Sequence, residues 1–171
     1  MYRARNDKRK MTKKKMTWTE KLNDSKDLPK IQEVTENLSR RWGTGKFVIP
    51  APLEVDAIMR SVPKGKVMTI NDIRDCLAKK HGVNFACPIT TGIFAWIAAN
   101  AAEESYAAGK KDITPWWRTL KTGGELNPKY PGGTGEQASR LISEGHTIIP
   151  GKGKKAPMVK DYEKKIVKKV R

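Results

Sequence analysis

The chain has 171 residues, a length that suits one domain with tails, and 37% of them are hydrophobic, which is enough for a modest core. No apolar run approaches the roughly 20 residues that span a bilayer, and the basic N-terminus lacks the apolar segment of a secretory signal. The two cysteines, Cys76 and Cys87, make no disulfide framework, and neither has a partner at a zinc-type spacing. We therefore expect a soluble protein of the cytoplasm or nucleoid, with no membrane partner, no metal and no cofactor.

The net charge of +17 is concentrated at the two ends of the chain. Residues 1–16 hold eight basic residues and one acidic residue, and residues 151–171 hold nine basic and two acidic residues. The segment 17–150 is nearly balanced, with eighteen basic and fifteen acidic residues. Cationic ends of this kind favour polyanions, nucleic acid first, although solvated basic tails also serve solubility alone.

Composition predicts three parts: a disordered basic arm over residues 1–24, a folded domain over 25–150, and a basic C-terminal strand or helix extension over 151–171. In the domain, a first helix is predicted from Asp27 to Trp42, since apolar residues recur there at helical spacing after a capping Asp. A second helix follows Pro52, because proline suits the first turn of a helix.

The next segment has the pattern of a helix-turn-helix. Thr69 and Asp72 match a capping box, which predicts that a helix begins there. After a short break, Thr90 or Thr91 is expected to cap a second helix that ends at Gly109. Two helices joined by a turn are typical of DNA-binding proteins of this class.

The C-terminal part predicts a short helix from Thr134 to Glu144 and two strands over residues 147–149 and 157–159. These strands are candidates for the wing of a winged helix. A basic amphipathic helix is predicted from Asp161 to Arg171. The fold class is therefore predicted as α+β, mostly helical, with a winged helix-turn-helix and basic flexible tails.

Small residues recur at helical spacing along the second helix of the pair. A smooth stripe of this kind lets another backbone come close, and in this interpretation that backbone is DNA in a groove, with the two threonines near phosphate. The alternative is that the stripe packs against a neighbouring helix. The residues expected at the groove are Thr90, Thr91, Gly92, Ala95, Ala99 and Ala102.

Four phrases in the same order resemble the DNA-binding domain of the O6-alkylguanine-DNA alkyltransferases. Residues 62–69 resemble the family's Pro-x-Gly-x-Val-x-Thr, and residues 115–120 (Pro-Trp-Trp-Arg-Thr-Leu) its active-site phrase Pro-Cys-His-Arg-Val-Val. Residues 130–133 resemble Tyr-x-Gly-Gly, and residues 141–145 resemble Leu-Leu-x-x-Glu-Gly. The resemblance implies that the predicted domain is a winged-helix module of this family.

The departures from the family pattern concern its chemistry. The acceptor cysteine position is Trp116, which has no nucleophile, and the histidine that follows it in the family is Trp117. Glu144, from the family's proton relay, remains. The resemblance is therefore to the alkyltransferase-like subgroup, which has Trp in place of the cysteine, binds alkylated guanine without repairing it and flags it for excision repair.

Three more positions bear on base flipping. The family's base-rotating Tyr falls on Ile70, its Arg finger near Thr91, and its Asn hinge on Ala108. Flipping usually needs a side chain that fills the hole in the duplex, so groove binding carries over from the family better than base flipping does.

The resulting hypothesis is a monomeric, non-enzymatic protein that recognises alkylated guanine in double-stranded DNA and contacts DNA repair proteins. Two alternatives stay open: a divergent methyltransferase that uses Cys87, and a general chromosome-binding protein that ignores lesions. Trp116 and Trp117 also stay open as core aromatics. Besides the groove residues named above, Lys64, Lys66 and Arg118 are expected at phosphates, and Trp116, Trp117, Tyr130 and Glu144 are expected to line a base or alkyl pocket.

Overall fold

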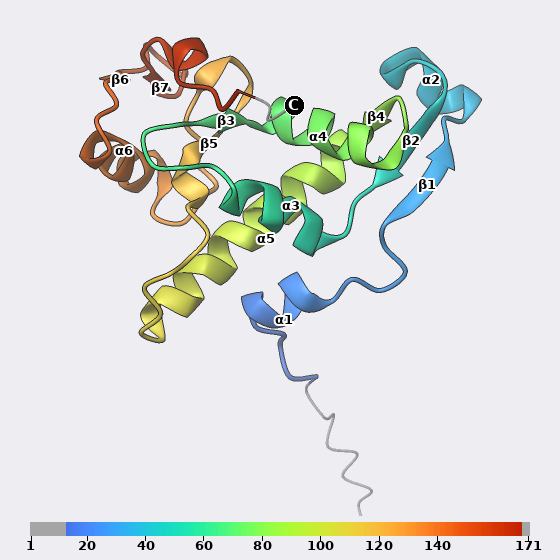
Figure 1. Ribbon diagram of the computed structural model, residues 1–171, viewed down its shortest axis with the longest axis horizontal. Helices are drawn as coiled ribbons and strands as arrows, with labels where there is room; N and C mark the ends of the chain where they lie inside the picture. The colour runs from blue at the N-terminus through green and yellow to red at the C-terminus, as the bar shows by residue number, and fades with distance from the viewer. Residues whose placement is uncertain (1–12, 169–171) are drawn as a thin grey trace, which may run out of the picture.

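The computed structural model describes residues 13–168, and a long helix, α5 (Pro88–Ala107), runs through its centre (Figure 1). Two helices pack against α5 from the part of the chain that precedes it, α3 (Pro52–Arg60) and α4 (Ile70–His81). A short N-terminal helix, α1 (Trp18–Asn23), packs along α5 as well. These four helices form the body from which the smaller elements extend.

The remaining elements lie toward the two ends of this body (Figure 1). At one end, β1 (Lys30–Glu33) pairs with β2 (Lys46–Ile49) in antiparallel fashion, and β2 pairs with β4 (Phe85–Ala86) in parallel; α2 (Glu36–Trp42) lies beside them. Toward the other end lie two further strand pairs, one helix and three 3-10 turns. They are β3 (Met68–Thr69) with β5 (Thr119–Leu120), β6 (Ile148–Ile149) with β7 (Met158–Val159), α6 (Gly133–Ser143), and the turns Trp116–Arg118, Thr122–Gly124 and Tyr162–Lys164.

Buried apolar side chains form two clusters. The larger one joins α3, α4 and α5 around Met59, Ile73 and Leu77, and it includes Trp116. The smaller one joins the residue just before β3 to β5, α6 and β7. Its members are Val67, Leu120, Leu126, Leu141 and Val159. Trp117 packs against both clusters and so connects the two halves of the molecule.

Several local predictions are confirmed. The Thr69 hydroxyl accepts a hydrogen bond from the Asp72 amide while the Asp72 carboxylate accepts one from the Thr69 amide, and α4 begins there. The helices predicted after Pro52 and from Thr134 are present as α3 and α6. The two candidate wing strands pair as β6 and β7, with Ile148 opposite Val159. The fold is α+β with helices predominating, and its description as a winged helix stays a prediction.

The predicted helix from Asp27 to Trp42 is wrong over its first half. Residues 30–33 form β1 instead, because backbone pairing with β2 places Ile31 opposite Val48, and only the part from Glu36 is helical. The second helix of the pair begins at Pro88, with Cys87 as its N-cap, so Thr90 and Thr91 lie within it and do not cap it.

The predictions for the two tails are also corrected within the described residues. Part of the expected disordered arm is helix α1, which a capping box between Thr17 and Glu20 begins; the arm's residues 1–12 lie outside the described residues. The helix predicted from Asp161 is a single 3-10 turn, and the chain then bridges back to the body because Val67 exchanges backbone hydrogen bonds with Lys165 and Val167. Residues 169–171 of that prediction lie outside the described residues as well.

Among residues 13–168, no helix is both long enough and apolar enough to cross a membrane. In the same residues, no group of three or more His, Cys, Asp or Glu side chains is placed to hold a metal ion.

Candidate nucleic-acid interface

The small-residue stripe of α5 faces inward. Ala95, Ala99 and Ala102 are 1%, 0% and 5% exposed and belong to the larger core cluster. The prediction that they contact DNA is therefore wrong, and the alternative of helix packing is correct. The physical reason is that short side chains allow α1 and α3 to pack closely on α5.

The exposed side of α5 is unusually apolar. Ile89, Ile93 and Trp96 are 57%, 46% and 37% exposed, and their spacing of four and three residues places them on one face of the helix. Single exposed apolar residues are ordinary on a protein surface, but three on one helical face form a patch that requires an explanation.

This apolar face forms one wall of a groove of about 530 Å³. The opposite wall comes from the segment between β5 and α6. The lining residues are Ile89, Gly92, Ile93 and Trp96 from α5, with Lys121, Asn127, Pro128 and Lys129 from that segment. Both lysines are exposed. The groove therefore combines an apolar, aromatic wall with two positive charges, and Gly92 is the one predicted DNA-contacting residue that lines it.

Because Gly92 has no side chain, the groove-facing surface near the start of α5 is open. A Cβ atom placed on Gly92 would meet nothing within 4 Å. The two threonines before it do not face outward in the same way. The Thr91 hydroxyl is buried and donates to the Cys87 carbonyl oxygen at 2.6 Å, and the Thr90 hydroxyl oxygen is buried too. Neither is placed to contact phosphate, so these two predictions are corrected.

Trp116, at the position that resembles the family's acceptor cysteine, lies in the core. Its ring is fully buried, and its Nε1 donates to a Glu103 carboxylate oxygen at 2.8 Å. The rings of Trp117 and Tyr130 meet it edge to face at centroid distances of 5.8 and 5.7 Å. Burial also raises the pKa of the Tyr130 phenol. Trp116 and Tyr130 are therefore core aromatics and not walls of an open pocket.

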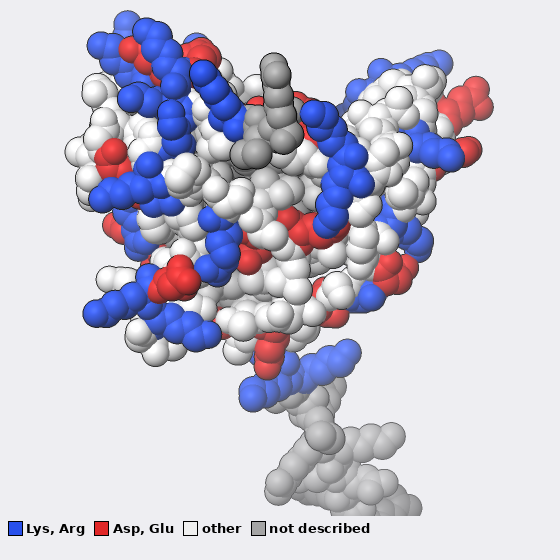
Figure 2. Space-filling model, viewed as in Figure 1, with Lys and Arg blue, Asp and Glu red and all other residues white. Residues whose placement is uncertain are grey.

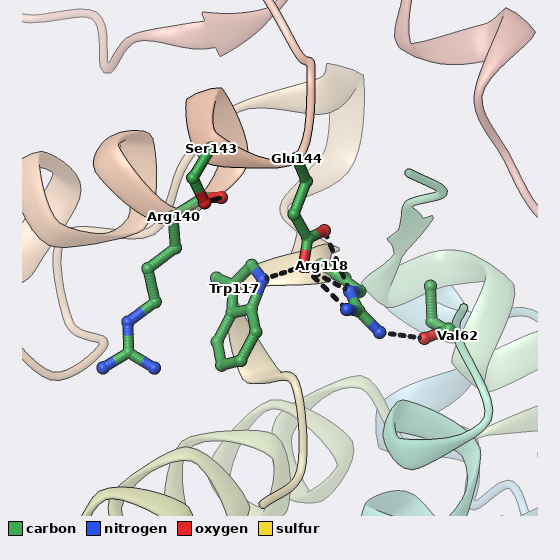
Figure 3. Close-up of polar contacts among 6 residues, drawn as sticks. All are labelled: Val62, Trp117, Arg118, Arg140, Ser143 and Glu144. Atoms are coloured by element: carbon green, nitrogen blue, oxygen red, sulfur yellow. Dashed lines mark hydrogen bonds and ion pairs between the residues drawn. The ribbon is translucent and has the colours of Figure 1, made fainter. Parts of the chain in front are cut away.

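Trp117, Arg118 and Glu144 form one hydrogen-bonded group (Figure 3). Trp117 Nε1 donates to Glu144 Oε1 at 3.0 Å, and Arg118 donates to the same carboxylate through Nε and Nη2, the latter at 2.6 Å. Arg118 Nη1 donates to the Val62 carbonyl oxygen at 2.7 Å. Arg118 is therefore fully engaged inside the protein, and the prediction that it meets phosphate is wrong.

The same contacts determine the charge on Glu144. Burial raises the pKa of its carboxyl group, but the hydrogen bonds from Arg118 and Trp117 and the Arg118 charge outweigh burial, so the pKa lies below its usual range. Glu144 is ionised and paired. It lines no part of the groove described above.

Arg140 of α6 covers the outer side of the tryptophan pair. Its guanidinium carbon lies 4.7 Å from the Trp117 ring centroid and 5.3 Å from that of Trp116. It also pairs with Glu103 at 2.8 Å and with Glu136 at 2.8 Å. Sequence reasoning missed this residue, although an Arg one helical turn after Glu136 is a signal for such a pair. We call Trp116, Trp117, Arg118, Tyr130, Arg140 and Glu144 the closed cluster.

One glutamine connects the closed cluster to the groove. Gln137 of α6 is fully buried, and its amide nitrogen donates to the carbonyl oxygens of Trp117 and Thr119 at 3.2 and 3.1 Å. Its amide oxygen accepts from the Asn127 backbone N–H at 2.8 Å. The second wall of the groove is thus fixed at its base by a side chain that also holds the strand behind the tryptophans.

The remaining predicted phosphate contacts, Lys64 and Lys66, are exposed in the turn between α3 and β3. Further lysines are exposed around β6 and β7, and Figure 2 shows basic side chains gathered over that end of the molecule. They are Lys152, Lys154, Lys155, Lys160, Lys164 and Lys165.

Neither cysteine has the exposed position of a reactive surface thiol. Cys87 is buried at the N-terminus of α5, and its backbone N–H donates to the Val48 carbonyl oxygen. Cys76 is half-buried on α4. Neither lines the groove.

Comparison with known proteins gives one distant similarity. No protein-family model matches the chain, and no curated protein matches it. A solved structure of S. pombe Atl1, in complex with damaged DNA containing O6-carboxymethylguanine, is similar with a TM-score of 0.45 and 18% sequence identity. The match covers 69% of this chain and 94% of that chain.

The groove residues that sequence reasoning missed share one signal. Ile89, Ile93 and Trp96 repeat at helical spacing, and such a repeat of large apolar residues is normally assigned to the core. In α5 both sides of the helix carry apolar residues, so periodicity alone does not say which side is buried.

Proposed function

We propose that this protein is a non-enzymatic DNA-binding protein that holds double-stranded DNA against the exposed face of α5 and receives an alkylated guanine in the adjoining groove. The observation that carries the proposal is the groove itself, with Ile89, Ile93 and Trp96 on one wall and Lys121 and Lys129 at the other.

The composition of the groove suits a nucleotide. Its volume of about 530 Å³ is that of a small-ligand site. Apolar and aromatic side chains favour the faces of a base, and lysines at the edge favour phosphate. The net charge of +17 and the exposed lysines around β6 and β7 add attraction to DNA that does not depend on sequence.

The chemistry of the closed cluster argues against alkyl transfer. A tryptophan at the position that resembles the acceptor offers no nucleophile, and here it is buried. Glu144 is held as an ionised partner of Arg118 and so is not free to act as a base. For the rival methyltransferase, Cys87 would have to leave the core to meet a methyl group. The proposed role is therefore recognition, in the cytoplasm or nucleoid, by a monomeric winged-helix domain that has β6 and β7 as its wing and that DNA repair proteins then contact.

Fluorescence anisotropy with two duplexes of one sequence, with and without a single O6-methylguanine, tests the proposal. We expect tighter binding of the modified duplex. Charge reversal of both Lys121 and Lys129 should weaken binding and make the fall of log affinity with log salt shallower by about 2, since each neutralised phosphate contributes about 0.9 to its steepness. The matched control reverses Lys110 and Lys111, which lie just beyond the far end of α5. Equal losses in both variants would contradict a role for the groove.

A second candidate is a general chromosome-binding protein that ignores lesions. The specific observation in its favour is the burial of Thr91, because no side chain at that position can fill the hole left by a flipped base. The same titration separates the two candidates. Equal affinity for the plain and modified duplexes supports the second one.

A further inference from the structure

Helix α1 is attached to α5 through one carboxylate, that of Glu104. The backbone N–H groups of Trp18 and Thr19 donate to Glu104 at 3.0 and 3.1 Å, and the Thr19 hydroxyl donates at 2.8 Å. A carboxylate that accepts from the first N–H groups of a helix stabilises that end of the helix. Glu104, from α5, thus accepts hydrogen bonds from the first N–H groups of α1, as the Thr17 side chain does from the position just before the helix.

The attached helix reaches the groove through a pair of tryptophans. The Trp18 ring meets the Trp96 ring edge to face, with centroids 4.7 Å apart and planes at 83°. Trp96 is a lining residue of the groove and is still 37% exposed. Lys21 Nζ also lies over the Trp18 ring, 4.3 Å from its centroid. The N-terminal segment therefore contacts the groove wall without lining the groove.

We propose that Trp96 stacks on an unpaired base held in the groove, and that α1 keeps the Trp96 ring in the orientation that stacking requires. The proposal rests on the DNA-binding function proposed above. Of the groove's lining residues, Trp96 alone is aromatic, and indole faces stack on any base. The edge contact with Trp18 limits the orientations open to the Trp96 side chain, so less conformational entropy is lost when a base binds.

The N-terminal segment thereby contributes to base binding as well as to charge. Loss of α1 should weaken base binding even though no α1 residue lines the groove. It should leave contacts with the phosphates of an intact duplex unchanged, since Lys121 and Lys129 lie on the opposite wall.

The test uses the full chain and a duplex with a single bulged 2-aminopurine, which is already unpaired and whose fluorescence is quenched by stacking. Wild type should quench it. Trp96→Ala should abolish the quenching and weaken binding of the bulged duplex about tenfold, as expected for the loss of one stacked base. Trp96→Phe should restore most of the quenching. Glu104→Ala, which removes the acceptor for α1, should give a partial loss of quenching and about threefold weaker binding.

Ile142→Ala is the control, because Ile142 is also an exposed apolar residue but lies on α6 outside the groove. Binding of the same duplex without the bulge is measured for every variant. If wild type binds neither duplex, the proposed function fails and the inference fails with it. If wild type binds but Trp96→Ala quenches as wild type does, the stacking role is overturned while DNA binding stands. If Trp96→Ala loses quenching and Glu104→Ala does not, the role of α1 is overturned.

Discussion

The closed cluster and the groove lie on either side of Gln137, and they use their side chains in opposite ways. In the closed cluster, Glu144 accepts from Trp117 and Arg118, and Arg140 covers the tryptophan rings. In the groove, Ile89, Ile93 and Trp96 are left in contact with solvent. Polar groups whose hydrogen bonds are already made within the protein have few donors or acceptors left for a ligand. Burial of exposed apolar surface under a ligand, by contrast, is favourable. The residues that carry the family resemblance are therefore not the residues best placed to bind.

The largest expected effect comes from breaking the closed cluster. Glu144→Ala leaves the Arg118 guanidinium half-buried without its partner, so we expect a loss of about 3–5 kcal/mol in the free energy of unfolding. Chemical denaturation measures it. Glu136→Ala is the control, since its partner Arg140 keeps Glu103. DNA affinity per folded molecule should not change. A loss of affinity in Glu144→Ala but not in Glu136→Ala would show that the closed cluster takes part in DNA binding.

The next effect separates the two faces of α5. Ala99→Leu adds bulk to a fully buried position and should lower the unfolding free energy by about 1–3 kcal/mol, with unchanged affinity per folded molecule. Gly92→Ala on the open face should instead raise stability by about 0.5–1 kcal/mol, since its Cβ has room and alanine favours a helix. Thermal unfolding and a DNA titration on each variant check both. Strong weakening of binding by Ala99→Leu without loss of stability would place DNA on the inner face after all.

The smallest effect concerns His146, a buried residue beside the closed cluster whose ring nitrogens have no hydrogen-bond partner among the described residues. Burial lowers its pKa; the Glu144 charge opposes this, and the charges of Lys165 and Arg118 add to it. The folded state therefore binds this proton less readily than the unfolded state does. Stability should be full above about pH 6.5 and fall as the pH drops below that value, by at most about 1.4 kcal/mol per pH unit.

Denaturation midpoints between pH 7.5 and 5.5 measure this dependence. His146→Leu should flatten the profile, and His81→Gln serves as the comparison, because His81 already has a partner in Glu54. A profile that stays equally steep without His146 would assign the dependence to another group.

Local signals in the sequence were enough for much of the fold. The Thr69–Asp72 capping box and Pro52 specify their own helices, since the interactions that begin them lie within a few residues, and β6 pairs with β7, the next strand in the chain. The first predicted helix failed because β1 is formed by pairing with β2, a partner some fifteen residues away that helical spacing does not reveal.

The site was harder to predict for a related reason. The phrases around Trp116 and Glu144 mark residues that do lie together, but whether they form a pocket or a packed cluster depends on Arg140 and Glu103 from other elements. Which face of α5 is buried depends on α1 and α3. These helices pack against its small residues and leave Ile89, Ile93 and Trp96 exposed. Helical periodicity shows the two faces and does not say which one another helix will cover.

The hydrogen bonds of Gln137 predict which residues near the groove tolerate substitution during evolution. Its amide fixes Asn127 at the root of the second wall through the backbone N–H, so the fixed point does not depend on which side chains the segment carries next. Pro128 and Lys129, just beyond that point, are exposed and take no part in either core cluster. Substitutions there alter what the groove prefers at little cost to folding, whereas a change at Gln137 releases the wall as a whole. Chains that share this architecture should therefore differ most in residues 128 and 129 and least at residue 137.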